Sequence, residues 1–214
     1  MKRILFMHQA SSIGGGSYCL LNIIKELDKK KFEPVVALKE EGPLAIELCN
    51  MKIEVVFFPE MSLVPYNRRL FRLNSLKAYY KVIRSIETFK ILLQRVKADV
   101  LYLNNMMIYP YLRPAKELGL KTVLHVREHW PQNEHKRQLE WARRSVYNYA
   151  DTIIAINHYS ASMFPQKTAT IVYDWIDMEE RRQDISMSEV LGEEASGKKV
   201  LLYTGGLHEI KGAD

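Results

Sequence analysis

The sequence has few cysteines and no long apolar run. Only Cys19 and Cys49 occur among its 214 residues, which gives little support to a disulfide or a cysteine-ligated metal site and is typical of two buried thiols in a reducing compartment. The N-terminal apolar run, residues 4–7, is too short for a secretory signal peptide, and no window reaches the length that spans a bilayer. We therefore expect a protein of the cytoplasm.

Other absences exclude further classes of protein. The sequence contains no internal repeat, no low-complexity tract and no recognisable nucleic-acid-binding module, so no nucleic-acid partner is expected. His125 and His129 are four residues apart, but His125 lies in strand-like sequence and no third ligand has matching spacing, so no metal site is expected. The 47% hydrophobic and 26% charged content is ordinary for a globular protein.

The most informative stretch connects an apolar strand to a helix through glycine. Residues 3–7 indicate a strand, and Gly14, Gly15 and Gly16 precede a helix expected at 17–29, whose first residue is a serine suited to cap it. Glycine inside a helix costs roughly 1 kcal/mol relative to alanine, so we place all three in the connection. Bare N–H groups at a helix start attract anions. The stretch predicts a site for a phosphate-bearing ligand, with a flexible turn as the alternative.

Strands and helices alternate along the chain with short connections. This alternation predicts an α/β fold, a Rossmann-like parallel sheet with helices on both faces. Ligands of such sheets gather at the carboxyl ends of the strands. The expected strands are 3–7, 33–38, 53–58, 99–103, 121–126, 152–156 and 170–173, and the expected helices after the first are 44–48, one or two within 70–97, 111–118, 134–149 and 159–164. Polar residues at strand ends are Asn104, Asn105, His125, Glu128, His129 and Asn157.

Positive charge is concentrated in one part of the chain. The formal net charge is +6, and within residues 67–97 nine lysines and arginines stand against Glu87 alone. Three interpretations stay open: a solvated helix face, a peripheral contact with an anionic membrane through Arg68, Arg69 and Arg72, and a nucleic-acid contact, which is the least favoured of the three.

A dinucleotide-binding fold is the nearest rival interpretation. Gly14 and Gly16 supply the first two glycines of its fingerprint, but the third falls on Cys19, and the loop that begins after Met7 is longer than the tight first turn of that fold. The expected second strand, 33–38, is followed by Lys39-Glu40-Glu41, an acidic pair where one acidic residue is required. Dinucleotide binding is therefore not favoured.

Four segments, taken in order and with their spacing, carry a family resemblance. They are the glycine segment Gly15-Gly16-Ser17-Tyr18, His125 at the fifth strand, the segment 171–177, which ends in Asp177, and the segment 203–212, which contains Lys211. Together they resemble the GT-B glycosyltransferases, specifically the retaining, nucleotide-sugar-dependent enzymes of family 4. The resemblance covers the whole chain.

The resemblance implies a domain division and a reaction. Residues 1–177 correspond to an N-terminal Rossmann-like, acceptor-side domain, 178–197 to a linker, and 198–214 to the first strand and loop of a truncated, donor-binding C-terminal domain. The implied reaction is transfer of a hexosyl unit from a nucleotide sugar to a saccharide or lipid-linked acceptor in cell-surface polysaccharide or glycolipid synthesis, at the inner face of the membrane. No cofactor or metal is implied, and the chain by itself is expected to be inactive.

Site residues follow from the same resemblance. His125 corresponds to the active-site histidine, and Gly206 stands where the family has a donor-binding arginine. The implied donor-diphosphate residues are Gly14, Gly15, Gly16 and Lys211, and the implied acceptor-side residues are Asn104, Asn105, Glu128 and His129. The alternative is a non-catalytic Rossmann-like module that binds a membrane surface or a partner through the basic residues 67–97.

Overall fold

The fold is described from a computed structural model, which covers residues 1–64, 66, 73–130, 136–175, 189–190, 192 and 198–199. The chain divides into two compact units, Met1–Trp175 and Ile176–Asp214. Nearly all the described residues belong to the first unit, which is considered by itself below. Most of the predicted linker, 178–197, and most of the segment 198–214 lie outside the described residues.

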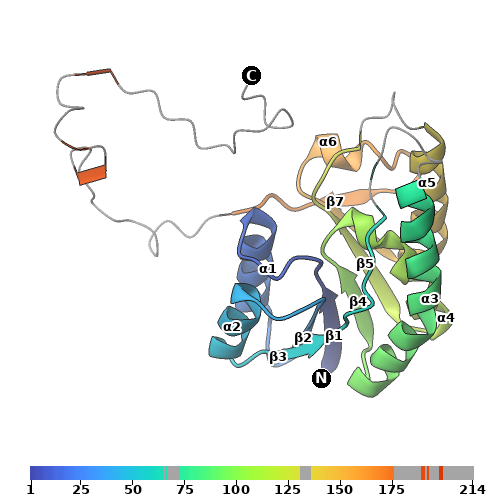
Figure 1. Cartoon of the computed structure of the whole chain (residues 1–214), viewed down its shortest axis with the longest axis horizontal. Coiled ribbons are helices and arrows are strands. Elements are labelled where there is room, and N and C mark those ends of the chain that lie inside the picture. Colours follow the sequence, from blue (N-terminus) through green and yellow to red (C-terminus); the bar gives the residue numbers. More distant parts are fainter. Residues whose placement is uncertain are drawn as a thin grey trace. The chain divides into compact units, whose positions relative to one another are not determined.

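The first unit is built on one parallel sheet of seven strands in the order β3-β2-β1-β4-β5-β6-β7, with helices along both of its faces (Figure 1). This architecture confirms the predicted α/β, Rossmann-like class. The strands are β1 (Lys2–Met7), β2 (Phe32–Leu38), β3 (Glu54–Phe57), β4 (Val100–Leu103), β5 (Lys121–Val126), β6 (Thr152–Ala155) and β7 (Ala169–Ile171). The helices are α1 (Gly15–Glu26), α2 (Pro43–Asn50), α3 (Leu73–Val96), the 3₁₀ helix η1 (Met106–Tyr111), α4 (Leu112–Glu117), α5 (Lys136–Tyr149) and α6 (His158–Ala161).

Two hydrophobic cores lie on opposite faces of the sheet, because successive side chains of a strand point to opposite sides. In β1, Ile4 and Phe6 pack with α1 and α2, whereas Leu5 and Met7 pack with α3, α4 and α5. All four side chains are buried. Since both faces of β1 are covered, the strand is a continuous apolar run rather than an alternating one.

Helix α1 begins two residues earlier than predicted. Gly14 is its N-cap, Gly15 and Gly16 are its first two residues, and no side chain caps it. The expectation that Ser17 caps the helix was wrong, because its hydroxyl donates instead to the Ser12 carbonyl at 2.8 Å. The placement of all three glycines in the connection was also wrong for Gly15 and Gly16, which leaves the first two residues of the helix without side chains.

The basic stretch forms one long helix over most of its length. Helix α3 spans Leu73–Val96 and buries Phe89, Leu92 and Leu93 against the sheet. The residues proposed for membrane contact, Arg68, Arg69 and Arg72, lie outside the described residues.

The two cysteines differ in environment. Cys19 is buried and Cys49 is exposed, so the expectation of two buried thiols holds for the first only. Position 49 falls in the last turn of α2, and its side chain lies on the outer side of that short helix. Among the described residues, no helix is long and apolar enough to cross a membrane.

Candidate functional site

A cavity of about 400 Å³ lies at the carboxyl ends of three neighbouring strands, β1, β4 and β5. Ligands of parallel α/β sheets bind at this edge, because the loops that leave the strands there bring distant parts of the sequence together. Five of the predicted site residues line the cavity: Gly15, Gly16, Asn104, Asn105 and Glu128.

The start of α1 supplies one wall of bare backbone. A Cβ atom built on Gly14 or Gly15 would meet no heavy atom within 4 Å, so the space above these residues is open. A Cβ on Gly16 would lie 3.7 Å from His8 Cε1 and 3.8 Å from Arg127 Nε. The first N–H groups of a helix have no intrahelical acceptor and carry the positive end of the helix dipole. This wall is therefore suited to bind an anion.

His8 forms the floor of the cavity and is held in one tautomer. The Asn104 side-chain amide donates to His8 Nδ1 at 3.1 Å, and His8 Nε2 lies 3.2 Å from Ser17 Oγ. Because the Ser17 proton goes to the Ser12 carbonyl, Nε2 carries the imidazole proton and donates to Oγ. Burial, with a smaller contribution from the charge of Arg127, lowers the pKa of His8 to about 4. His8 is therefore neutral at physiological pH.

Arg127 is the cation of the site. Its side chain is only 9% exposed, and Nη2 donates to Asp174 Oδ2 at 2.6 Å. Asp174 lies in the segment after β7, and the carbonyl of the next residue, Trp175, accepts a hydrogen bond from the Asn22 side chain on α1 at 3.1 Å. The guanidinium thus lies next to the glycine wall and is neutralised by a carboxylate from the end of the first unit.

His125, the predicted catalytic residue, lies within β5 and is 1% exposed. Its Nδ1 is 2.8 Å from the Tyr102 hydroxyl and 3.5 Å from Arg127 Nη1. Since a guanidinium can only donate, Nδ1 is the acceptor and Nε2 carries the proton. Nε2 is buried and has no partner among the described residues. Burial first, and the Arg127 charge second, lower the pKa of His125 to about 4.

The predicted acceptor-side residues are only partly brought together. Asn104 is fully buried, whereas Asn105 and Glu128 both cap the 3₁₀ helix η1. Asn105 Oδ1 accepts from Met107 N at 2.6 Å, and Glu128 Oε1 accepts from Met106 N at 2.9 Å. Burial raises the pKa of Glu128, and these backbone donors oppose the shift.

His129 lies apart from the residues that line the cavity. Its ring stacks on Tyr159 with the centroids 3.6 Å apart, and its Nδ1–H donates to the Tyr159 carbonyl at 3.0 Å. Tyr159 is 65% exposed. The predicted diphosphate ligand Lys211, together with Gly206, lies outside the described residues. In the part of the chain that the structure describes, no three His, Cys, Asp or Glu side chains are grouped as metal ligands.

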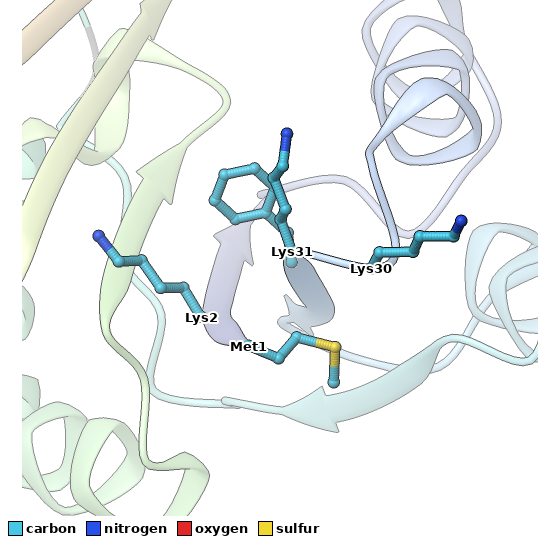
Figure 2. Close-up of a pocket in the computed structure, with 5 residues that line it drawn as sticks. Met1, Lys2, Lys30 and Lys31 are labelled. Atoms are coloured by element: carbon cyan, nitrogen blue, oxygen red, sulfur yellow. The ribbon is translucent and has the colours of Figure 1, made fainter.

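A second hollow, of about 470 Å³, lies at the amino end of the sheet. Lys2, Lys30 and Lys31 line it, but their ammonium groups point away from one another (Figure 2). Lys31 also pairs with Asp28 at 3.2 Å. Lysines that share no common target do not form an anion site, so the cavity at the carboxyl ends remains the candidate.

Five residues that line the cavity were not predicted: His8, Gln9, Cys19, Arg127 and Asp174. The sequence contained a signal for three of these residues, because His8 and Gln9 directly follow β1 and Arg127 directly follows β5. The strand-end rule that selected Asn104 applies equally to them. Asp174 follows β7 by only a few residues, but nothing local in the sequence indicates its pairing with Arg127.

The fold defines a Rossmann-like α/β domain, and comparison with known proteins places it in a family. The chain matches the sequence model of Glycosyltransferase Family 4 over residues 13–180. It therefore belongs to glycosyltransferase family 4, as the resemblance implied. A comparison with curated protein sequences found no significant match.

Solved GT-B glycosyltransferases have a similar fold. HepE from Anabaena, in complex with UDP and glucose, is 20% identical with a TM-score of 0.58, over 84% of this chain and 46% of HepE. MurG from Acinetobacter baumannii is 14% identical with a TM-score of 0.55, over 81% of this chain and 45% of MurG. A UDP-glucosyltransferase from Polygonum tinctorium is 12% identical with a TM-score of 0.55, over 86% of this chain and 55% of that enzyme. The chain thus spans about half the length of these structures.

Proposed function

We propose that this chain provides the acceptor-side domain of a retaining glycosyltransferase that uses a nucleoside-diphosphate sugar. In this proposal residues 1–177 bind the acceptor, 178–197 are a linker, and 198–214 begin a donor-binding domain. The acceptor is a saccharide or a lipid-linked saccharide of cell-surface polysaccharide or glycolipid synthesis. Family membership supports the reaction class, and the complexes of HepE with UDP and UDP-glucose support the donor class.

One observation carries the proposal: the side-chain-free start of α1 lies beside the buried guanidinium of Arg127. Sugar transfer requires stabilisation of a diphosphate leaving group, and backbone N–H groups with a bidentate cation are suited to this task. In our proposal the donor diphosphate binds the N–H groups of Gly14, Gly15 and Gly16 and replaces Asp174 on Arg127. Lys211 serves as a second cation.

Further roles in the proposal belong to His125 and to the retaining chemistry. The Nε2–H of His125 is buried without a partner among the described residues, and the residue does not line the cavity. We therefore assign to this group a contact with the donor sugar or the incoming acceptor that forms only when the ligand binds. No protein nucleophile, metal or cofactor is assigned. In a protein that joins this chain to a donor-binding domain, His125→Gln is expected to lower kcat with little change in the affinity for the nucleotide.

The proposal is tested by titrating the chain with UDP, GDP and ADP sugars in a calorimeter. Charge-assisted hydrogen bonds contribute about 1.5–3 kcal/mol, so Arg127→Gln is expected to weaken the best ligand by about tenfold or more. Asp174→Asn is expected to strengthen it, because it releases Arg127. The exposed Arg144 on α5 is the matched control for loss of one positive charge. Unchanged affinity in Arg127→Gln would contradict the proposal, and robust sugar transfer by this chain alone would contradict its two-domain part.

A second candidate function is contact with an anionic membrane through α3. Leu76, Tyr80 and Ile83 are more than half exposed, and their spacing of four and three residues places them on one face of the helix. The exposed cations Lys77, Lys81 and Arg84 belong to the same turns. An exposed apolar stripe beside cations on a surface helix is typical of interfacial binding.

Vesicle co-sedimentation tests this second function. The chain is expected to bind vesicles with phosphatidylserine more strongly than vesicles of phosphatidylcholine alone, and reversal of the three α3 cations to glutamate is expected to abolish the difference. Reversal of three exposed lysines elsewhere, Lys29, Lys30 and Lys39, changes the net charge equally and is the control. Equal effects of the two triple variants would indicate that only net charge matters and that α3 has no such role.

A further inference from the structure

The segment that follows β7 crosses from the edge of the sheet back to α1 (Figure 1). Strands β4, β5 and β6 lie between β7 and β1, the strand whose loop leads into α1. Val172 N still donates to the Ala155 carbonyl of β6 at 2.9 Å. Three residues later, the Trp175 carbonyl accepts from the Asn22 side chain on α1 at 3.1 Å. Residues 172–175 therefore form a strap across the carboxyl edge of the sheet.

The strap supplies the counter-ion of Arg127. Arg127 Nη2 donates to Asp174 Oδ2 at 2.6 Å, and the guanidinium side chain is 9% exposed, whereas the carboxylate side chain is 35% exposed. Both residues line the cavity at the glycine wall. A guanidinium binds a carboxylate and a phosphate through the same N–H donors. Asp174 therefore occupies donors that an incoming phosphate group would use.

The strap lies along the face of α1 that begins at the glycine wall. Gly16, Cys19 and Asn22 follow one another at intervals of three residues, so they share one face of the helix. Burial raises the pKa of the Cys19 thiol, the charge of Arg127 lowers it, and Asp174 raises it. Both members of the ion pair therefore lie beside this thiol, between the wall and the Asn22 contact.

Polar contacts hold the strap, because its large side chains bury little surface. Tyr173 is 62% exposed and Trp175 is 39% exposed. Segments with few buried apolar contacts open locally at a low free energy, without unfolding of the domain. An anion that binds Arg127 takes the donors of Asp174, and the Asn22 contact then holds the strap on α1. The strap is therefore placed to open when an anion binds.

We propose that the strap is an autoinhibitory contact: Asp174 occupies the anion site in the free chain, and a phosphate-bearing ligand binds when the strap opens. That this ligand is the donor diphosphate rests on the proposed function. The apparent affinity of such a site equals its intrinsic affinity multiplied by the fraction of molecules in which the site is open. A substitution that loosens the strap therefore strengthens anion binding, even at a residue that does not touch the ligand.

Asn22→Ala is the sharpest variant. Asn22 does not line the cavity, and its substitution removes the hydrogen bond to Trp175 while it leaves the net charge, Arg127 and Asp174 unchanged. Loss of one neutral hydrogen bond is expected to strengthen anion binding by about twofold to tenfold. Alanine is favoured in a helix, so the variant is expected to fold. The exposed Asn148 of α5 supplies the matched control, Asn148→Ala.

The test combines two measurements on the whole chain and its variants. The first is calorimetric titration with inorganic pyrophosphate, in which Asp174→Asn is expected to bind about tenfold more tightly, Asn22→Ala about twofold to tenfold more tightly, and Asn148→Ala as the unchanged chain does. The second is amide hydrogen exchange of residues 172–175. This exchange is expected to be faster in both strap variants without ligand, and in the unchanged chain when pyrophosphate saturates it.

Two results would overturn the strap: equal pyrophosphate affinity in Asn22→Ala and Asn148→Ala, or exchange at residues 172–175 that neither Asp174→Asn nor pyrophosphate accelerates. Equal binding of pyrophosphate by all four chains would refute the strap and leave the donor site standing. The expected pyrophosphate responses without binding of any nucleoside-diphosphate sugar would support the strap and refute the proposed donor. No binding of pyrophosphate by any of the four chains would refute both.

Discussion

Acid is expected to unfold this domain in the pH range in which its two buried imidazoles take up protons. His8 and His125 have a pKa of about 4 in the folded chain, because burial and the charge of Arg127 disfavour the protonated ring. In the unfolded chain the ordinary value is about 6.5. Between these values the unfolded state binds more protons, so the free energy of unfolding falls as the pH falls from about 6.5 to about 4.

The size of the effect is large relative to the stability of a domain. One pKa unit corresponds to about 1.4 kcal/mol, so each imidazole removes about 3 kcal/mol over the full range. The free energy of unfolding of a typical domain is about 5–15 kcal/mol, so protonation of the two imidazoles removes a large part of it. The carboxyl of Glu128 acts in the opposite direction, because burial raises its pKa.

Urea denaturation at a series of pH values between 7 and 4 measures this slope. For the unchanged chain it is expected to approach about 2.7 kcal/mol per pH unit, and His8→Gln is expected to reduce it by about half. His158 is exposed on α6, and His158→Gln is the control substitution. If His8→Gln does not fold, NMR titration of the imidazole Cε1–H signals of the unchanged chain gives the two pKa values directly. Values near 6.5 for both rings would refute the reasoning.

Three further predictions concern single contacts, each measured by thermal and urea unfolding. Gly42→Ala is expected to destabilise, since a Cβ there would lie 2.6 Å from the Ser11 carbonyl oxygen; unchanged stability would mean that this loop adjusts freely. Gly15→Ala is expected to raise the free energy of unfolding by up to about 1 kcal/mol, because alanine is favoured over glycine in a helix. The same variant is expected to lose diphosphate binding, because its Cβ occupies the open space above the glycine wall. Unchanged diphosphate binding would mean that the ligand binds elsewhere. Tyr111→Phe is expected to cost about 1–3 kcal/mol, because the buried hydroxyl accepts from Ser62 N at 3.0 Å and lies 2.8 Å from Ser85 Oγ; no loss would show that water replaces the hydroxyl.

The fold was predictable because its information is local. Apolar runs such as residues 35–38 lie in strands covered on both faces, and the intervening helices have a regular apolar period, so the order of elements follows from pattern alone. The start of α1 was predicted two residues too late, because the intrinsic helix propensity of glycine is low. Gly15 and Gly16 are nevertheless helical, and the space above residues 14 and 15 is open. Local preference therefore failed at the place where the proposed ligand binds.

The site was predictable only to the level of the sheet edge. The strand-end rule correctly grouped Asn104, Asn105 and Glu128, but it does not tell that Asn105 and Glu128 also cap η1. Nor does it reveal the pair of Arg127 with Asp174, which joins residues 47 positions apart. Such roles depend on how loops meet in space, and sequence spacing does not encode them.

The most direct test of the central claim is a titration of the ¹⁵N-labelled chain with inorganic pyrophosphate and with UDP, followed by NMR. If the diphosphate binds at the glycine wall beside Arg127, the largest shifts appear at the backbone N–H groups of Gly14, Gly15 and Gly16 and at Arg127 Nε–H. They disappear in Arg127→Gln. Shifts confined to the lysine-lined hollow at the amino end of the sheet, or no saturable shifts with either ligand, would contradict the account.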